Sequence, residues 1–339
     1  MRMSEKPRIA IATGDPGGIG PEISIKAALD PAVRAACNPI VVSDPVMLER
    51  HGSACGIKAE LRVVAQIADP DWSGPWLNVL DCPQPGAVDV AFGTSSADGG
   101  HAAIAFARAA IKAAVGGAVD AVVAAPQNEI SIALAGIKFD GHPSFVARET
   151  GTDESDVYLM LCFERTRIVH CTLHQSVKTA IAMITRERVL GALTAAQRAL
   201  EQLGIAAPKI AVSGLNPHAG EGGLFGREEI EIITPAITTA IAQGIAAAGP
   251  FGADILFHKS GFDAYVVMLH DQGHIAAKLL APSSAAALTI GTPILFSSVA
   301  HGRANDIAGK GIANPAAMVS ALLQLSNVKK MRARESATA

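Results

Sequence analysis

The sequence has no cluster of basic residues and no marked excess of charge. Among its 339 residues, 28 Lys and Arg face 31 Asp and Glu, which gives a formal net charge of −3 at pH 7. Proteins that hold nucleic acids or anionic membranes by electrostatics concentrate positive charge, because cations must neutralise the phosphates. We therefore expect neither partner and predict that the chain binds small molecules.

Cysteine is scarce and shows no paired spacing. The five cysteines are odd in number and include no Cys-x-x-Cys. A disulfide framework needs paired cysteines in an oxidising compartment, whereas isolated thiols are typical of a reducing cytosol. The polar first residues also lack the apolar stretch of a signal peptide or a membrane span. We therefore expect a cytoplasmic protein.

Apolar residues are abundant and are arranged in alternating strands and helices. They make up 50% of the chain, and 339 residues are many for one compact core, so we predict an α/β protein of two lobes. Residues 1–130 with 300–339 are expected to form the first lobe and residues 131–299 the second. The pattern predicts strands at 9–13, 38–42, 121–125, 158–163, 167–172 and 209–212, and helices at 101–115, 186–203 and 315–325.

A glycine-rich turn at residues 14–20 joins the first strand to a helix that begins near Pro21. Such turns can hold phosphate through backbone N–H groups and the helix dipole. The glycines depart from the G-x-G-x-x-G order, however, and Asp44 after the next strand is as typical of a turn as of a ribose-binding acid. We favour a structural or substrate-side turn over a standard dinucleotide site.

Three histidines, His174, His218 and His270, each follow a predicted strand. Neutral imidazole is a common metal ligand, and three protein ligands leave a position open for substrate or water. Spacing alone leaves their convergence open, because a histidine at a strand end more often hydrogen-bonds within a loop. We interpret them as candidate ligands of one zinc, cobalt, manganese or magnesium ion.

Residues 301–315 form a second glycine-rich segment, and this one is long and specific. It closely resembles the adenosine-binding loop of the isopropylmalate and isocitrate dehydrogenase families. The resemblance implies that His301, Asp306 and Asn314 hold the adenine and its ribose. It also implies the two-lobed fold of those enzymes, with mixed sheets and the active site between the lobes. A carboxylate at Asp306 would repel a 2′-phosphate, so NAD is favoured over NADP.

Several further motifs resemble the 4-hydroxythreonine-4-phosphate dehydrogenase family over nearly the whole chain. They are GDPGGIGPE at 14–22, Gly141-His142, LNPHAGE at 215–221, HDQG at 270–273 and Lys278. The resemblance implies an NAD-dependent oxidoreductase in which His174, His218 and His270 bind a divalent metal. It further implies a homodimer with a shared site, in which one metal ligand comes from the second subunit.

The positions that hold phosphate in that family are altered in this chain. They correspond to His142, Pro143, Lys278, Ala287 and Phe296, so three of five polar contacts are missing. A phosphate dianion needs donors or cations to replace its hydration, and each charge-assisted bond contributes about 1.5–3 kcal/mol. The sequence therefore argues against a phosphorylated substrate.

The same departures resemble the terephthalate dihydrodiol dehydrogenase branch of the family. The agreement covers Glu129, Pro143-Ser144 and the segments 167–170, 172–174, 268–275, 278–282 and 297–299, whereas His142 stands where that branch has Tyr. The resemblance implies NAD-dependent oxidative decarboxylation of 1,2-dihydroxycyclohexa-3,5-diene-1,4-dicarboxylate to protocatechuate, a step of aromatic catabolism. Lys278 would pair with a substrate carboxylate or shuttle a proton, and His142 would contact the substrate.

Other residues near these motifs are weaker candidates. Asp254 resembles a family aspartate near the metal that could orient a ligand histidine or accept a proton. Asp271, His170 and His274 have lesser claims. Three alternatives stay open, namely a dehydrogenase for a 4-phosphorylated hydroxy acid such as 4-phosphohydroxythreonine, a three-histidine metal hydrolase and a non-catalytic binding protein.

Overall fold

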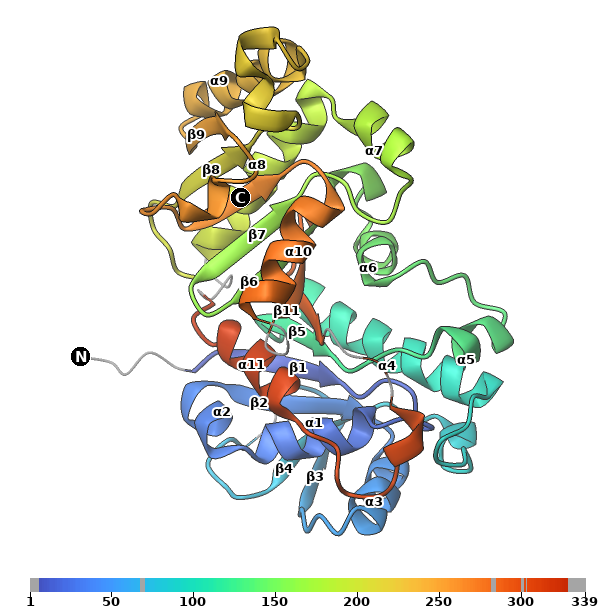
Figure 1. The fold of residues 1–339 in the computed structure, drawn as a ribbon. Helices are drawn as coiled ribbons and strands as arrows, with labels where there is room; N and C mark the ends of the chain where they lie inside the picture. Colours follow the sequence, from blue (N-terminus) through green and yellow to red (C-terminus); the bar gives the residue numbers. More distant parts are fainter. Residues whose placement is uncertain (1–5, 68–70, 282–284, 300–301, 303, 329–339) are drawn as a thin grey trace, which may run out of the picture. The chain divides into compact units, whose positions relative to one another are not determined.

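The computed structural model describes residues 6–67, 71–281, 285–299, 302 and 304–328. The chain divides into two compact units, which consist of residues 1–150 with 293–339 and of residues 151–292. Both units have strands and helices along their length, as Figure 1 shows, so the predicted α/β class is confirmed. Within the described residues no helix combines the length and the apolar character that a membrane crossing requires.

The first unit is built on a parallel sheet. Its strands, in order across the sheet, are β3 (Leu61–Val64), β4 (Leu77–Asp81), β2 (Asn38–Ser43), β1 (Arg8–Ala12), β5 (Ala121–Ala124) and β12 (Phe296–Val299). All of these neighbours run parallel. Strands β1, β2 and β5 are mostly apolar, and all their residues except Arg8 and Asn38 are buried, as expected for a parallel sheet covered on both faces.

Helices surround this sheet. They are α1 (Gly20–Leu29), α2 (Pro31–Ala36), α3 (Pro45–Ala54), α4 (Ala97–Val115), α5 (Glu129–Leu134), α6 (His142–Thr150) and α11 (Ala316–Gln324). Helix α1 packs beside α2 and α11 (Figure 1). Ile132 of α5 and Phe145 and Val146 of α6 belong to the same buried apolar cluster as the Ala-rich face of α4. For that reason the first segment of this unit continues past residue 130, where a boundary was expected, to Thr150.

The second unit has a mixed sheet. Its strands, in order across the sheet, are β11 (Ala286–Ile290), β6 (Tyr158–Phe163), β7 (Thr166–His170), β10 (Ala264–Val267), β8 (Lys209–Ser213) and β9 (Ala246–Phe251). Strand β6 runs antiparallel to both β11 and β7, whereas β7, β10, β8 and β9 are mutually parallel. The antiparallel β6–β7 hairpin was predicted, and Glu164 in its tight turn has a positive φ of 47°.

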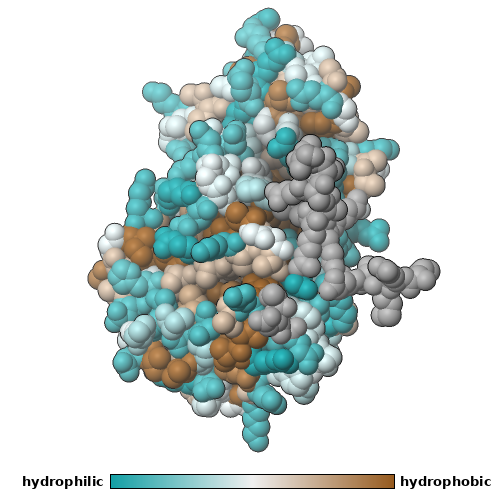
Figure 2. All heavy atoms as spheres, turned by 180° about the vertical axis from the view of Figure 1, so that it is seen from behind, coloured by the Kyte–Doolittle hydropathy of each residue, from teal (hydrophilic) through white to brown (hydrophobic). Residues whose placement is uncertain are grey.

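The helices of the second unit are α7 (Val177–Met183), α8 (Arg186–Gln202), α9 (Thr234–Ala242) and α10 (His270–Leu280). Helix α8 begins where the sequence predicted, because Thr185 caps it by accepting the backbone N–H of Arg188. Figure 2 shows hydrophilic side chains spread over the visible face, with apolar patches between them.

Candidate metal and cofactor sites

The three candidate metal ligands follow neighbouring strands in the sheet of the second unit, where the carboxyl ends of these strands lie together. Strand β10 pairs in parallel with β7 on one side and with β8 on the other. His174 follows β7, His218 follows β8, and His270 is the first residue of α10 after β10. Because parallel strands end at one edge, the topology alone brings these segments to a common region, as in other open α/β sheets.

His174 and His270 lie side by side, with ring centroids 5.6 Å apart. Their segments are joined just beyond the regular strands, where the Cys171 N–H donates to the Val267 carbonyl over 2.8 Å. The Thr172 hydroxyl donates to the Met268 carbonyl, also over 2.8 Å. These bonds extend the β7–β10 pairing past His170 and hold the two histidines in register.

The start of α10 is fixed by Gln272, which the sequence interpretation had not singled out. Its Oε1 accepts the backbone N–H groups of Met268 and Leu269 at 2.9 and 3.0 Å. Its Nε2 donates to the Gly214 carbonyl at 3.0 Å, which connects the His270 segment to the loop that carries His218. Asp271 lies 2.7 Å from Nδ1 of His270, so that nitrogen donates and Nε2 keeps the lone pair that a metal ligand would need.

Two further histidines complete a cluster around His270. The His274 ring stacks on the His270 ring at 3.8 Å with an interplanar angle of 11°. Nδ1 of His274 lies 3.1 Å from Nε2 of His170, which is fully buried. Burial, followed by the nearby histidines, lowers the pKa of His170 to about 3 and that of His274 to about 4, so both rings are neutral at pH 7.

His218 stands on a strained loop. Residues His218, Ala219 and Glu221 all have φ between 44° and 53°, within an unbroken left-handed run that ends at Gly223. Left-handed backbone costs a residue other than glycine about 1–2 kcal/mol, so this turn needs external support. Such strain is most common at functional sites, where the surrounding structure imposes it.

Glu229 provides that support, a role that no pattern in the sequence indicates. Its side chain is 3% exposed. Oε1 accepts the backbone N–H groups of Leu215 and Asn216 at 2.7 and 2.8 Å, and Oε2 accepts the Asn216 side-chain amide at 2.9 Å. A buried carboxylate with three donors is well satisfied, and it holds the strand-to-loop transition that precedes His218.

The described part of one chain does not gather three metal ligands. No group of three or more His, Cys, Asp or Glu side chains within it could hold a metal ion. His174 and His270 form a pair, while Nδ1 of His218 lies 3.5 Å from Glu221 Oε2 and its ring lies 6.1 Å from that of Phe225. Two imidazoles fit a late first-row divalent ion only when a further ligand completes the set.

Asp254 and Lys278 lie in the same unit at different places. A Cβ on Gly252 would lie 2.6 Å from Asp254 Oδ1 and 3.6 Å from His218 Cα, so Asp254 borders the His218 loop. Lys278 is exposed and follows His274 by one helical turn on α10. Within the described residues the ammonium group of Lys278 has no ion-pair partner, which leaves it available to an anion.

The expected adenosine loop belongs to the first unit. Asp306 and Asn314 are both exposed, and Asn314 Oδ1 accepts the Ala316 N–H at 2.9 Å at the start of α11. His301, the third residue assigned to this loop, lies outside the described residues. The two described side chains face solvent, as contact with a ligand requires.

The first glycine-rich turn is packed into the first unit. All residues from Gly14 to Gly20 are buried, and Asp15 accepts the Gly17 N–H at 2.7 Å and the Ser131 hydroxyl at 2.6 Å. The Gly17 and Gly18 N–H groups are therefore already bonded to Asp15 within the turn. Asp44 accepts the N–H groups of Val46 and Met47 at the start of α3, which confirms that it is a turn and cap residue.

His142, the candidate substrate contact of the first unit, sits among apolar groups. Its ring centroid is 5.2 Å from that of Phe296 and 5.6 Å from that of Phe139. Burial lowers the pKa of His142 to about 4, and its buried Nδ1 has no hydrogen-bond partner among the described residues. The imidazole is therefore neutral at pH 7 and supplies no positive charge.

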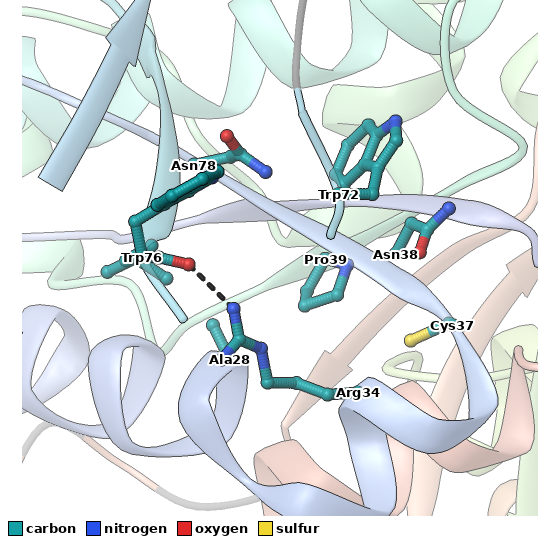
Figure 3. Close-up of a pocket in the computed structure, with 9 residues that line it drawn as sticks. Ala28, Arg34, Cys37, Asn38, Pro39, Trp72, Trp76 and Asn78 are labelled. Carbon is teal, nitrogen blue, oxygen red and sulfur yellow. Dashed lines mark hydrogen bonds between the residues drawn. The ribbon is translucent and has the colours of Figure 1, made fainter. Parts of the chain in front are cut away.

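A cavity in the first unit is too small for a substrate. Its volume is about 30 Å³, and Arg34, Trp72, Trp76 and Asn78 are among its lining residues (Figure 3). Arg34 crosses it to donate to the Trp76 carbonyl at 2.6 Å. Since one ordered water needs roughly 10–15 Å³ of such space, the cavity has room for about two waters. None of the candidate site residues lines it.

Comparison with known proteins gives consistent matches. The family model described as pyridoxal phosphate biosynthetic protein PdxA matches residues 35–325. The 1,2-dihydroxy-3,5-cyclohexadiene-1,4-dicarboxylate dehydrogenase of a Comamonas species is 40% identical over 320 residues, 94% of this chain and 96% of that protein. The D-threonate 4-phosphate dehydrogenase of Cupriavidus necator is 38% identical over 333 residues, 96% of this chain and 98% of that protein.

A solved structure agrees with these matches. The crystal structure of a 4-hydroxythreonine-4-phosphate dehydrogenase from Burkholderia phymatum matches with a TM-score of 0.87 at 36% identity. The match covers 95% of this chain and 98% of the other. Sequence and fold thus point to the same group of proteins.

Proposed function

This chain belongs to the PdxA family and is a dehydrogenase of that family, and on this premise we propose that it oxidatively decarboxylates a cyclic cis-dihydrodiol dicarboxylate with NAD. The proposed substrate is 1,2-dihydroxycyclohexa-3,5-diene-1,4-dicarboxylate. Substrate and NAD⁺ yield protocatechuate, CO2 and NADH. The C2 hydrogen leaves as hydride, and the bond from C1 to its carboxylate breaks. Membership of a dehydrogenase family excludes two of the alternatives for this chain, a three-histidine hydrolase and a non-catalytic binding protein.

The observation that carries the choice of substrate is the apolar setting of His142 and Phe296. Relatives named for a dicarboxylate diol and for a phosphorylated sugar acid are 40% and 38% identical, so identity does not decide between them. Phe296 is fully buried at a position where the resemblance implies a phosphate-binding arginine. With a neutral His142 beside it, this part of the site lacks the cations that a phosphate dianion needs.

The donor set fits a metal shared between two copies of the chain. We infer that His174 and His270 of one copy bind the ion together with His218 of a second copy. The separate position of His218 in a single chain supports this arrangement. In the cofactor site, Asp306 and Asn314 would hold the adenosine of NAD, with His301. Bound at these places, a divalent ion supplies Lewis-acid stabilisation of negative charge on the vicinal oxygens, and NAD supplies the hydride acceptor.

The remaining residues position the substrate and the ligands. Lys278 presents its ammonium group to a ring carboxylate, which orients the diol toward the histidines. Asp271 holds the His270 ring through Nδ1. Asp254, on the border of the His218 loop, accepts the proton of the reacting hydroxyl or orients His218. His142 contacts the substrate as a neutral group.

The test is NADH formation measured by absorbance with added divalent metal. The cis-dihydrodiol of terephthalate is assayed in parallel with D-threonate 4-phosphate and 4-phosphohydroxythreonine. NADH together with CO2 and protocatechuate from the first substrate alone supports the proposal. Turnover of a phosphorylated substrate alone would show that phosphate is held by other residues and would overturn it.

A further inference from the structure

Glu22 is a fully buried carboxylate that contacts the segment assigned to adenosine binding. It lies in the first turn of α1, and its Oε1 accepts the backbone N–H of Ala313 at 2.8 Å. The thiol of Cys55 on its other side donates to Oε2 at 3.4 Å. The two partners in the bond to Ala313 are 291 positions apart in the sequence, so the contact exists only in the folded chain.

Lys26 completes this arrangement one helical turn later. Its Nζ donates to Glu22 Oε1 at 2.7 Å, to the Gly311 carbonyl at 2.9 Å and to the Ala313 carbonyl at 2.8 Å. All three donors of the ammonium group are therefore used. The pair thus offers a carboxylate to the Ala313 N–H and a cation to the carbonyls of Gly311 and Ala313.

The segment itself is shaped to accept these bonds. Gly311 has a φ of +74°, and a Cβ there would lie 2.6 Å from the Cys55 carbonyl, so the close approach requires glycine. Earlier in the same segment, Asn305 donates from Nδ2 to the Gly93 carbonyl at 2.9 Å. Gly93 in turn donates to the Gly17 carbonyl at 2.7 Å. The segment is thus bound directly to α1 through Glu22 and Lys26, and Gly93 connects Asn305 to the turn before α1. Figure 1 shows the course of α1 and α11.

From these contacts we infer that Glu22 and Lys26 are positioning residues for NAD, which hold residues 311–313 so that Asn314 meets the adenosine. The inference rests on the proposed function, because it takes the cofactor and its loop from there. An exposed loop that is ordered only on binding loses affinity to the entropy of ordering, and a pre-formed loop avoids that loss. The helix that begins in the GDPGGIGPE motif accordingly serves the cofactor as the support of its loop.

The experiment is isothermal calorimetry of NAD on the purified, metal-loaded full chain and on Lys26→Met. Loss of the contacts that Glu22 and Lys26 make with residues 311–313, which we call the clamp, should weaken NAD binding about tenfold to hundredfold. AMP should be weakened by the same factor, because the loop holds the adenosine half. Nicotinamide mononucleotide should bind unchanged. Lys26→Arg should recover part of the affinity, and metal content should stay constant because the histidines belong to the other unit.

Two further variants guard against a folding effect. Glu22→Gln/Lys26→Met removes both charges together, so no buried carboxylate is left unpaired. Lys112→Met removes an exposed lysine of α4 and should bind NAD like the wild type. Hydrogen exchange at the Ala313 amide, measured without NAD, should accelerate in Lys26→Met and in the double variant and stay slow in the control.

The possible failures are distinguishable. If the wild type binds NAD and both clamp variants bind it equally well, the clamp inference is overturned while the proposed function stands. If exchange at Ala313 is unchanged in the variants, the clamp does not order the segment and the inference again fails. If the wild type binds no NAD at all, the proposed function fails first and the inference falls with it.

Discussion

His274 and His170 are joined through Nδ1 of the first and Nε2 of the second, 3.1 Å apart. Nδ1 of His170 faces the Leu159 carbonyl at 3.4 Å, and a carbonyl can only accept a proton. A neutral His170 therefore presents a bare Nε2, to which His274 donates from Nδ1. This assignment of donor and acceptor nitrogens fixes the tautomers of both rings. It also fixes the plane of the His274 ring, on which His270 stacks.

We predict that His170→Phe weakens metal binding although His170 is not itself assigned as a ligand. Without its acceptor the His274 ring loses its fixed plane, and His270 loses the surface against which it stacks. Supporting contacts of this kind change metal affinity about tenfold to hundredfold. The measurement is zinc competition against a chromophoric chelator. His101→Phe, an exposed position on α4, serves as the matched control, and equal affinity in both variants would remove the pair from the site.

Glu229 gives a second prediction, which concerns stability and the His218 loop together. Glu229→Gln keeps the shape of the side chain but turns an amide donor toward the Asn216 amide, also a donor. An unsatisfied buried donor costs about 1–3 kcal/mol, which urea unfolding should detect. Metal affinity should fall as well, because the left-handed turn at His218 loses its anchor.

The neighbouring Glu231→Gln is the control for this change. Glu231 is exposed and forms an ion pair with Arg227, and such pairs contribute about 0.3–0.5 kcal/mol on a helix. A similar loss of stability in both variants would mean that Glu229 has no special role in the loop.

The sequence predicted elements whose determinants are local. Strand β6 has the bounds 158–163 expected from its apolar run, and α8 starts at Arg186 after its Thr185 cap. The left-handed turn at His218 was not predicted, because most of its strain lies on residues other than glycine and its anchor is 11 positions away. The contact of Lys26 with Gly311 spans 285 positions and follows from no pattern in either segment.

The position of His51 predicts an acid-sensitive term in the stability of the first unit. Burial lowers the pKa of His51 from 6.5 to about 4, and the ring Nε2 faces the Pro16 carbonyl at 2.8 Å. The unfolded chain therefore takes up a proton near pH 6.5 that the folded chain refuses until about pH 4, so stability falls as the pH drops through this window. Above pH 7 the ring is neutral in both the folded and the unfolded chain, so no stability is lost. Below about pH 4 the ring is protonated in both, and the loss has reached its full size.

The measurement for His51 is the unfolding free energy in urea at pH 7 and pH 5. Between these values the wild type should lose about 2 kcal/mol more than His51→Gln, since Gln can still donate to Pro16 but cannot be protonated. Parallel losses in the two proteins would show that His51 is protonated alike in the folded and unfolded chains.

Lys278 gives the last prediction, which separates substrate binding from metal and cofactor binding. Its exposed ammonium group lies on the same helix as His270, so its removal should affect neither folding nor the ligand atoms. Lys278→Met should lower kcat/KM for the dicarboxylate diol about tenfold to hundredfold, the effect of losing one charge-assisted bond. Lys278→Arg should recover part of it, whereas Lys209→Met, an exposed lysine at the start of β8, should have no effect. A second substrate is the diol monoacid that lacks the ring carboxylate at C4. If Lys278→Met lowers kcat/KM for this monoacid as much as for the dicarboxylate, the lysine does not bind the C4 carboxylate. In that case its charge acts on the reacting carbon, and the C4 carboxylate must be held by another residue.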